Sequence, residues 1–227
     1  MKKFSYEEYK NIIKDFDFVD FNKLQKGKAV LRHDVEYSPE RALVMAKIDF
    51  ESNVQSSFFF QVCSNSYNLM SNENRDIVYE ILDMGHKIGL HVYCTYVADY
   101  NWNELEKEIQ IQEKLISTVC KVDRFCCHRP KAWMLKRTDD FICDMLNVYG
   151  KSSFNYPEPK EIKYFADSNH QWKYGYPSKK YDIVHINIHP DSWSEKGEDV
   201  DQNFKYLVLE NMNVFGDTLK KEAKQFQ

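Results

Sequence analysis

The sequence repeats a short apolar segment, a turn signal and then an amphipathic segment, and this alternation limits what the chain can fold into. The short segments are rich in Val, Ile, Leu and Phe, as buried strands are, whereas the longer ones repeat apolar residues at helical spacing. Strands that alternate with helices of about ten or more residues predict a mostly parallel sheet with helical crossovers, either open or closed into a barrel. We therefore expect an α/β protein.

The predicted elements follow one another without a linker. Strands are expected at residues 28–35, 56–62, 87–92, 124–127, 152–155 and 182–188. Helices are expected at about 39–53, 74–84, 103–119, 138–148 and 202–224. No Pro-, Gly- or Ser-rich stretch, internal repeat or low-complexity segment interrupts this order, so residues 1–227 are predicted to form a single domain.

Composition excludes several classes of partner. With 43% apolar and 29% charged residues the chain can form a full core, so disorder is not its dominant state. The formal net charge is −4 without a basic stripe, which predicts no nucleic-acid partner. The N-terminus lacks a signal-peptide segment and no later stretch has 18 uncharged apolar residues, so we expect a cytoplasmic protein without membrane insertion. The six cysteines form no C-x-x-C pair and are expected to be reduced and mostly buried.

Polar side chains gather at the carboxyl ends of the predicted strands, where parallel α/β folds place their functional residues. They are Asp34, Glu36, His91, His128, Arg129 and His189. If these strand ends converge, two carboxylates, three imidazoles and a guanidinium share one site. That set can hold a divalent metal and activate water, and its ligand types suit zinc, iron or cobalt.

Each of these residues also has a purely structural explanation. Asp34 and Glu36 could be ordinary strand-end or helix N-terminal acids. Alternation places them on one face of the strand and His33 on the other, so His33 is expected to pack in the core. The same structural role is expected for three other histidines, His86, His170 and His185.

The motifs and their order resemble the polysaccharide deacetylase family (carbohydrate esterase family 4), in particular its members in surface-glycan biosynthesis. The segments that carry the resemblance are HDVE (33–36), GHKIGLH (85–91), HRP (128–130), DSNHQW (167–172) and INIHPDSW (186–193). The motif-bearing core spans about residues 28–193. The resemblance implies an irregular (β/α) barrel of about seven parallel strands.

The resemblance also implies roles for individual residues. Asp34 corresponds to the catalytic base, and Glu36 and His91 correspond to metal ligands. Arg129 corresponds to the arginine that steadies the base, and His189 to the general acid. The late motifs imply that substrate is bound by Asp167, Trp172 and Trp193, with the tryptophans and nearby tyrosines stacking on a sugar ring.

The sequence departs from the family at one metal ligand. Family members carry a second ligand histidine four residues after the first, and this position is Thr95. His128 could supply the missing imidazole, and we predict Glu36, His91 and His128 as the ligands. His189 could instead bind the metal, or no metal is held, because two protein ligands make a poor zinc site.

Together these features predict a metal-dependent hydrolase that removes an acyl group, N-acetyl in the first instance, from an amino sugar or nucleotide sugar. The expected cofactor is a divalent metal, zinc before iron or cobalt. One alternative is a rewired or metal-free member of the fold that acts as a binding protein. Another is hydrolysis of a C–N bond outside sugars. The sequence predicts no oligomeric state.

Overall fold

The alternation of strands and helices produces one eight-stranded sheet in the computed structural model, which describes residues 3–154 and 161–226. The strands are β1 (Lys28–Val35), β2 (Ser57–Phe60), β3 (Lys87–Val92), β4 (Arg124–Cys127), β5 (Phe141–Ile142), β6 (Met145–Asn147), β7 (Ile162–Ala166) and β8 (Ile183–Ile188). Their order across the sheet is β5-β6-β4-β3-β2-β1-β8-β7. Neighbouring strands are parallel except β5 and β6. Seven strands thus share one direction, which confirms the predicted fold class.

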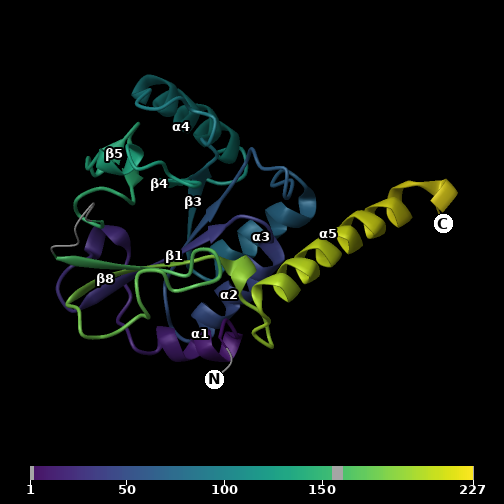
Figure 1. Cartoon of the computed structure of the whole chain (residues 1–227). Helices are drawn as coiled ribbons and strands as arrows, with labels where there is room; N and C mark the ends of the chain where they lie inside the picture. Colours follow the sequence, from purple (N-terminus) through teal and green to yellow (C-terminus); the bar gives the residue numbers. More distant parts are fainter. Residues whose placement is uncertain (1–2, 155–160, 227) are drawn as a thin grey trace.

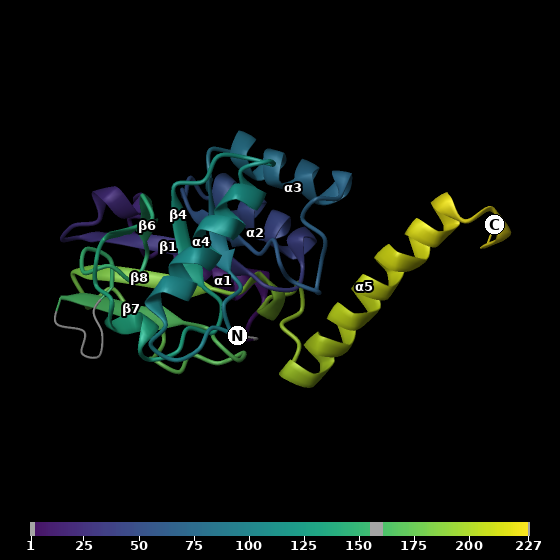
Figure 2. The same cartoon turned by 90° about the horizontal axis from the view of Figure 1, so that it is seen from above.

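The sheet curls into a half-barrel with β3 and β2 at its middle (Figure 1). The α-helices are α1 (Tyr6–Ile13), α2 (Pro39–Glu51), α3 (Asn72–Asp83), α4 (Trp102–Ile116) and α5 (Val200–Glu222). Short 3₁₀ turns occur at η1 (Phe21–Lys23), η2 (Met134–Lys136), η3 (Pro190–Ser192) and η4 (Lys224–Phe226). Helix α2 contacts β1, and helices α3 and α4 contact β3 (Figure 2). In the described part of the chain, no helix is long and apolar enough to cross a membrane.

Local sequence explains how α2 begins and why β3 lies close to its neighbour. The Ser38 hydroxyl accepts the Arg41 backbone N–H and Pro39 occupies the first turn, which is a standard helix start. In β3, a Cβ on Gly89 would lie 2.5 Å from the Phe59 ring. Only glycine therefore allows the two strands to pack at this point.

The helix predicted at residues 138–148 is wrong. The segment forms a hairpin of β5 and β6 joined by Cys143 and Asp144, which both have positive φ (53° and 61°). Two consecutive positive-φ residues make the tight turn that matches strand twist, although the Gly or Asn that usually marks it is absent. The Asn147 side chain closes the preceding loop by donating to the carbonyls of Arg137 and Asp139.

The strand predicted at residues 152–155 is also wrong for residues 152–154, which the structure describes. Residues 151–153 form a turn, and residue 155 lies outside the described part of the chain. The strand that pairs with β8 is β7 instead. Its side chains are only partly buried at Lys163 and Tyr164, so it lacks the continuous apolar run of the other strands.

Parallel pairing brings the carboxyl ends of the central strands to one edge of the sheet. In the register of β1 and β8, Arg32 lies beside Asn187. In the register of β3 and β4, His91 lies beside Cys126. The polar residues that follow these strands therefore meet at the same edge.

Candidate functional site

The carboxyl edge of the sheet encloses a cavity of about 430 Å³. Five of the nine residues predicted from the sequence line it: Asp34, Glu36, His91, Arg129 and His189. Its volume falls within the range of small-molecule sites.

Glu36, His91 and His128 bring three potential metal-ligand atoms together. The Glu36 Oε1 atom lies 2.7 Å from His128 Nδ1 and 3.3 Å from His91 Nε2. The two imidazole nitrogens are 3.2 Å apart. One carboxylate and two imidazoles are a donor set that suits zinc, iron or cobalt. His128, which follows β4, thus lies in contact with Glu36 and His91. It brings to this cluster the imidazole that Thr95 lacks.

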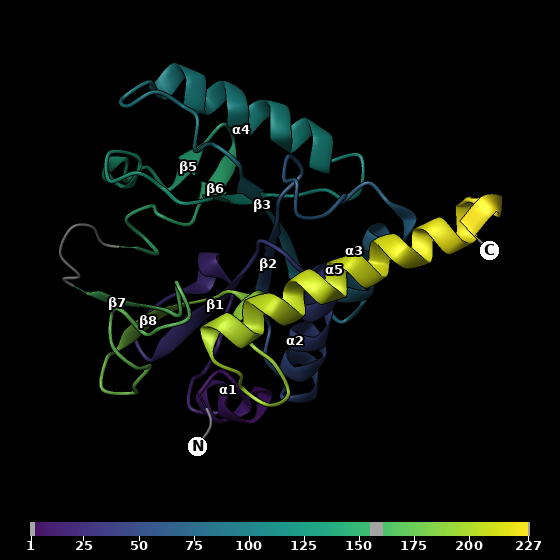
Figure 3. The ribbon, with the colours of Figure 1, turned by 45° about the vertical axis from the view of Figure 1, so that its right-hand side comes forward.

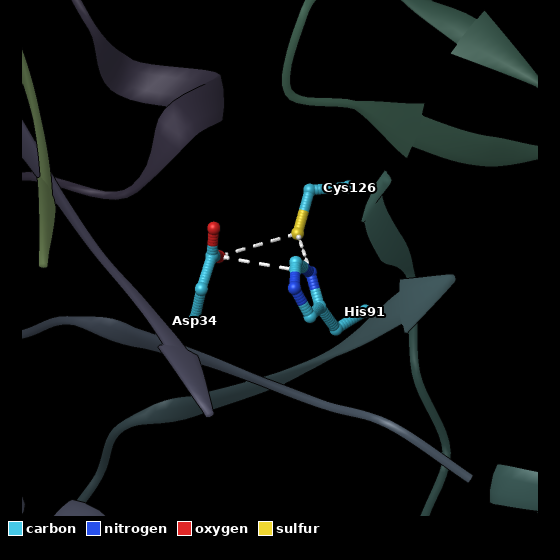
Figure 4. Close-up of side chains that lie close together, drawn as sticks. All are labelled: Asp34, His91 and Cys126. Atoms are coloured by element: carbon cyan, nitrogen blue, oxygen red, sulfur yellow. Dashed lines mark hydrogen bonds and ion pairs between the residues drawn. The ribbon is translucent and has the colours of Figure 1, made fainter. Parts of the chain in front are cut away.

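Further contacts hold the rings of His91 and His128 in place. The His91 Nδ1 atom lies 2.9 Å from the Cys126 sulfur, which in turn lies 3.3 Å from Asp34 Oδ1 (Figure 4). The His128 ring stacks on Tyr93, with 5.5 Å between centroids. Such contacts orient a metal-binding histidine. Cys126 was not identified from the sequence, although alternation and register place it beside His91.

Asp34, His91 and Cys126 also form a cluster of potential ligand atoms. Both oxygens of this carboxylate, however, already accept N–H groups of the positively charged Arg32. A second cation would be repelled there, so this cluster is better described as support for His91.

Asp34 is held by Arg32 rather than by Arg129. Arg32 Nε lies 2.8 Å from Asp34 Oδ1 and Nη2 lies 2.6 Å from Oδ2, while Asn187 Nδ2 donates to Oδ2 at 3.1 Å. Burial alone would raise the pKa of Asp34, but Arg32 and His91 hold it well below its usual range. Arg129 is exposed and lines the cavity together with Tyr37. The arginine that contacts Asp34 is therefore Arg32, which the sequence interpretation missed although it shares a strand face with Asp34.

His189 forms a buried ion pair with Asp167. Its Nδ1 atom lies 2.6 Å from Asp167 Oδ1, and its backbone N–H also binds this carboxylate. Burial alone would lower the pKa of His189, but Asp167 outweighs burial and raises it to about 10. His189 is thus protonated at neutral pH, with Nε2 3.9 Å from Asp34 Oδ2.

The residues expected to bind substrate lie behind the cavity rather than in it. Asp167 and Trp193 are fully buried, and the Trp193 indole N–H donates to Asp167 Oδ2 at 2.6 Å. Asp167 in turn contacts His189, and neither Asp167 nor Trp193 lines the cavity. Trp172 is half-buried and packs near Phe4 and Trp193. The rings that do line the cavity are Tyr37, Tyr149, Phe154, Tyr164, Tyr174 and Phe204.

Asp191 is a further cavity residue that the sequence interpretation did not single out. Its side chain is buried, and within the described residues its Oδ1 atom has no hydrogen-bond partner. Burial raises the pKa of Asp191 to about 7. Its position two residues after His189, in the motif HPD, is the signal that could have identified it.

The fold and the site together define an α/β protein whose half-barrel sheet ends in a polar cavity with a carboxylate–imidazole ligand group and an ion-paired histidine. No protein-family model matches the sequence, and no curated protein matches it.

The structure is similar to several solved structures. One is a carbohydrate esterase family 4 pseudoenzyme from Bacillus anthracis, with 18% identity, 82% of this chain and 62% of that chain covered, and a TM-score of 0.49. The chain thus spans less than two thirds of that protein's length. A second is a family 4 carbohydrate esterase from Bacillus anthracis (14% identity, 89% and 86% covered, TM-score 0.47). A third is a candidate polysaccharide deacetylase involved in O-antigen biosynthesis from Bordetella bronchiseptica (12% identity, 81% of each chain covered, TM-score 0.39).

Proposed function

We propose that this chain is a metal-dependent hydrolase that removes an acyl group, N-acetyl in the first instance, from an amino sugar of a cytoplasmic surface-glycan or nucleotide-sugar pathway. The observation that carries the proposal is the convergence of Glu36, His91 and His128 in a site that also contains Asp34 and His189. The order of the sequence motifs supports the choice of sugar chemistry.

The donor set fits a catalytic divalent metal. Glu36, His91 and His128 would hold it, because their ligand atoms already lie within about 3.3 Å of one another. Three protein ligands that leave a further position open are typical of catalytic zinc. When bound, such a metal polarises a carbonyl and lowers the pKa of water toward about 7.

The protein's own residues would move the two protons that the reaction requires. Asp34 is placed to accept the proton of the attacking water, and Arg32 and Asn187 fix its orientation. His189 is protonated at neutral pH and would donate its Nε2 proton to the departing amine. An amine leaves poorly unless it is protonated, so the reaction depends on His189.

The cavity wall offers apolar and polar contacts to a sugar. Tyr164, Tyr174 and Phe204 supply ring faces for the apolar side of a pyranose. The Oδ1 atom of Asp191, which has no partner among the described residues, can accept a hydrogen bond from a hydroxyl group.

One observation favours a second function, in which the chain binds a glycan without cleaving it. The N–H donors of Arg32 and Asn187 already occupy the Asp34 carboxylate and lower its affinity for a proton. A base with so low a pKa accepts a proton from water less readily. Metal and sugar binding without hydrolysis is therefore the alternative.

Metal analysis and acetate release separate the two functions. The purified chain is loaded with zinc, cobalt or iron and incubated with N-acetylated amino sugars and nucleotide sugars. We expect about one metal per chain, acetate release, and loss of release in Asp34→Asn but not in Asp83→Asn, which changes an exposed carboxylate on α3. Metal and sugar binding without release would support the binding protein, whereas a chain that binds no metal and releases no acetate contradicts the proposed hydrolase.

A further inference from the structure

Three side chains at the carboxyl end of β8 reach the cavity from every second position of the chain. They are Asn187, His189 and Asp191, and all three line the cavity. Helix α5 begins close to this segment and then extends away from the rest of the protein (Figure 3). The Asn203 side chain at the start of α5 donates to the Asp191 backbone carbonyl at 2.7 Å, and Arg41 Nη1 donates to the same oxygen at 2.9 Å. These two contacts fix the backbone of Asp191 beside the cavity.

Asn187 has an acceptor oxygen that the protein leaves unused. Its Nδ2 atom donates to Asp34 Oδ2 at 3.1 Å and to the Tyr164 hydroxyl at 3.2 Å. An ionised carboxylate only accepts hydrogen bonds, so the amide must turn its nitrogen toward Asp34. The Asn187 Oδ1 atom is buried and has no partner in residues 3–154 and 161–226. A ligand in the cavity can supply the missing donor.

Asp191 provides a second acceptor of the same kind. Only 5% of this residue is exposed, and its Oδ1 atom has no partner among the residues that the structure describes. A buried polar group without a partner costs free energy, which a ligand recovers by supplying that partner. Along the chain, His189 therefore lies between two acceptors that require donors from a ligand.

Arg32 adds an unused donor next to Asn187. The two residues lie side by side in the register of β1 and β8, and Arg32 gives its Nε and Nη2 atoms to Asp34. The Arg32 Nη1 atom is buried and without a partner in the described part of the chain. A hydroxyl group both donates and accepts, so one hydroxyl suits Arg32 Nη1 and Asn187 Oδ1 together. An ionised phosphate or carboxylate offers only acceptors and would leave the Asn187 and Asp191 oxygens unpaired.

We propose that the cavity selects amino sugars whose acylamino carbon lies between two carbons with free hydroxyl groups. Arg32 and Asn187 bind one hydroxyl, and Asp191 binds the other. This selection rests on the proposed function, because His189, between the two acceptors, is the group that protonates the departing amine.

The hydroxyl pattern defines a substrate class. A 3-acylamino hexose meets it through its hydroxyl groups at carbons 2 and 4, and a 2-acylamino hexose meets it only while the anomeric hydroxyl is free. In a nucleotide-linked 2-acylamino sugar, the oxygen at carbon 1 carries phosphate and has no hydrogen to donate. We therefore expect 3-acylamino sugars to bind more tightly than nucleotide-linked 2-acylamino sugars.

Calorimetric binding of defined sugars to the purified full chain tests the selection. The probes are methyl 3-acetamido-3-deoxyhexoside in its gluco and galacto forms, the 2-deoxy and 4-deoxy analogues of both, and uridine diphosphate N-acetylglucosamine. We expect the better-bound parent sugar to lose at least about tenfold in affinity when either hydroxyl is removed, and to bind at least about tenfold more tightly than the nucleotide sugar. Equal affinity for the parent and either deoxy analogue, tightest binding of the nucleotide sugar, or no binding of any probe would overturn the proposal.

Acetate release, measured in parallel, distinguishes a failure of this proposal from a failure of the proposed function. Selective binding without release refutes the hydrolase and leaves the selection standing. Release from every probe with similar kcat/KM refutes the selection alone.

Asp191→Ala tests the contact with the second hydroxyl. The variant lacks the acceptor, so its affinity for the parent sugar should fall at least about tenfold, whereas its affinity for one of the two deoxy analogues should stay within about twofold of the wild type. Asp201→Ala removes an exposed carboxylate in the first turn of α5 and should leave every affinity within about twofold. An equal loss for all sugars in Asp191→Ala would overturn the contact. The comparison of sugars on the wild-type chain needs no substitution, so it decides the proposal even where Asp191→Ala is unstable.

Discussion

Arg32 binds both carboxylate oxygens of Asp34 from two residues earlier on the same strand, at 2.8 and 2.6 Å. Residues two apart on a strand share a face, so β1 itself sets the orientation of this carboxylate. The guanidinium is fixed in turn, because it lies 5.2 Å from the centre of the Tyr149 ring and donates to its hydroxyl. Arg32 and Asp34 therefore form one rigid unit in the cavity floor.

We expect Arg32→Lys to lower kcat for acetate release by at least about tenfold with little change in KM, because lysine keeps the charge but loses the bidentate contact. The matched control is Arg129→Gln, which removes an exposed guanidinium and should alter KM more than kcat. Steady-state kinetics measures both. If Arg129→Gln lowers kcat as much as Arg32→Lys, then Arg32 is not the residue that positions Asp34.

The metal-ligand group predicts a contrast between two residues. His128→Ala removes a nitrogen that lies 2.7 Å from Glu36 Oε1, so the affinity for zinc should fall by at least about tenfold. Thr95→Ala should leave this affinity within about twofold, because Thr95 contributes no imidazole. Competition with a chromophoric chelator gives both affinities. A larger loss in Thr95→Ala would refute the assignment of His128.

Much of the site could be predicted because strand ends are local features of the sequence. Asp34 and Glu36 at the end of β1, His91 in β3 and His128 after β4 needed only the parallel topology to bring them together. Arg32 could have been found from the alternation of side chains along β1, because it shares a face with Asp34. The sequence interpretation instead expected Arg129 of the HRP motif to contact Asp34.

The missed features depend on contacts between residues far apart in the chain. Whether Trp193 faces a ligand or Asp167 is decided by how η3 packs on the sheet, and no local pattern encodes that packing. The β5–β6 hairpin was missed because apolar spacing favoured a helix, while the positive φ of Cys143 and Asp144 has no Gly or Asn signal.

The ion pair between His189 and Asp167 predicts the basic limb of the pH profile. Asp167 raises the pKa of His189 to about 10 against the effect of burial, so the imidazolium is lost only above that pH. In Asp167→Asn the opposing charge is gone and burial lowers the pKa of His189, so the basic limb should move down by several pH units. NMR titration of the His189 ring checks the shift independently of activity.

Trp193→Phe is the matched control for this shift. It removes the indole N–H that binds Asp167 Oδ2 but keeps the carboxylate beside His189. The basic limb should therefore remain near the wild-type position. A wild-type pKa of His189 near its ordinary value, or an unchanged pKa in Asp167→Asn, would contradict the assigned role of the ion pair.

His185 predicts how stability depends on acid. Its ring is fully buried, and its Nδ1 atom lies 2.9 Å from the Ser153 carbonyl oxygen. Burial and then the charge of Arg32 lower the pKa of His185 to about 3, whereas in the unfolded chain it titrates near 6.5. Between pH 3 and pH 6.5, His185 therefore binds a proton more readily in the unfolded chain than in the folded protein. The contribution of His185 to the free energy of unfolding is therefore fully present above pH 6.5 and falls by up to about 4 kcal/mol toward pH 3.

His185→Gln removes this titration and isolates its contribution from that of the carboxylates. We expect the variant to be less stable at pH 7 by about 1–3 kcal/mol, because the core contact is altered. Its free energy of unfolding should nevertheless fall less steeply than that of the wild type between pH 6.5 and 3. Urea unfolding at several pH values measures the difference, and His170→Gln, at a half-buried histidine, should largely retain the wild-type slope. Parallel curves for His185→Gln and the wild type would show that His185 accepts a proton in the folded protein.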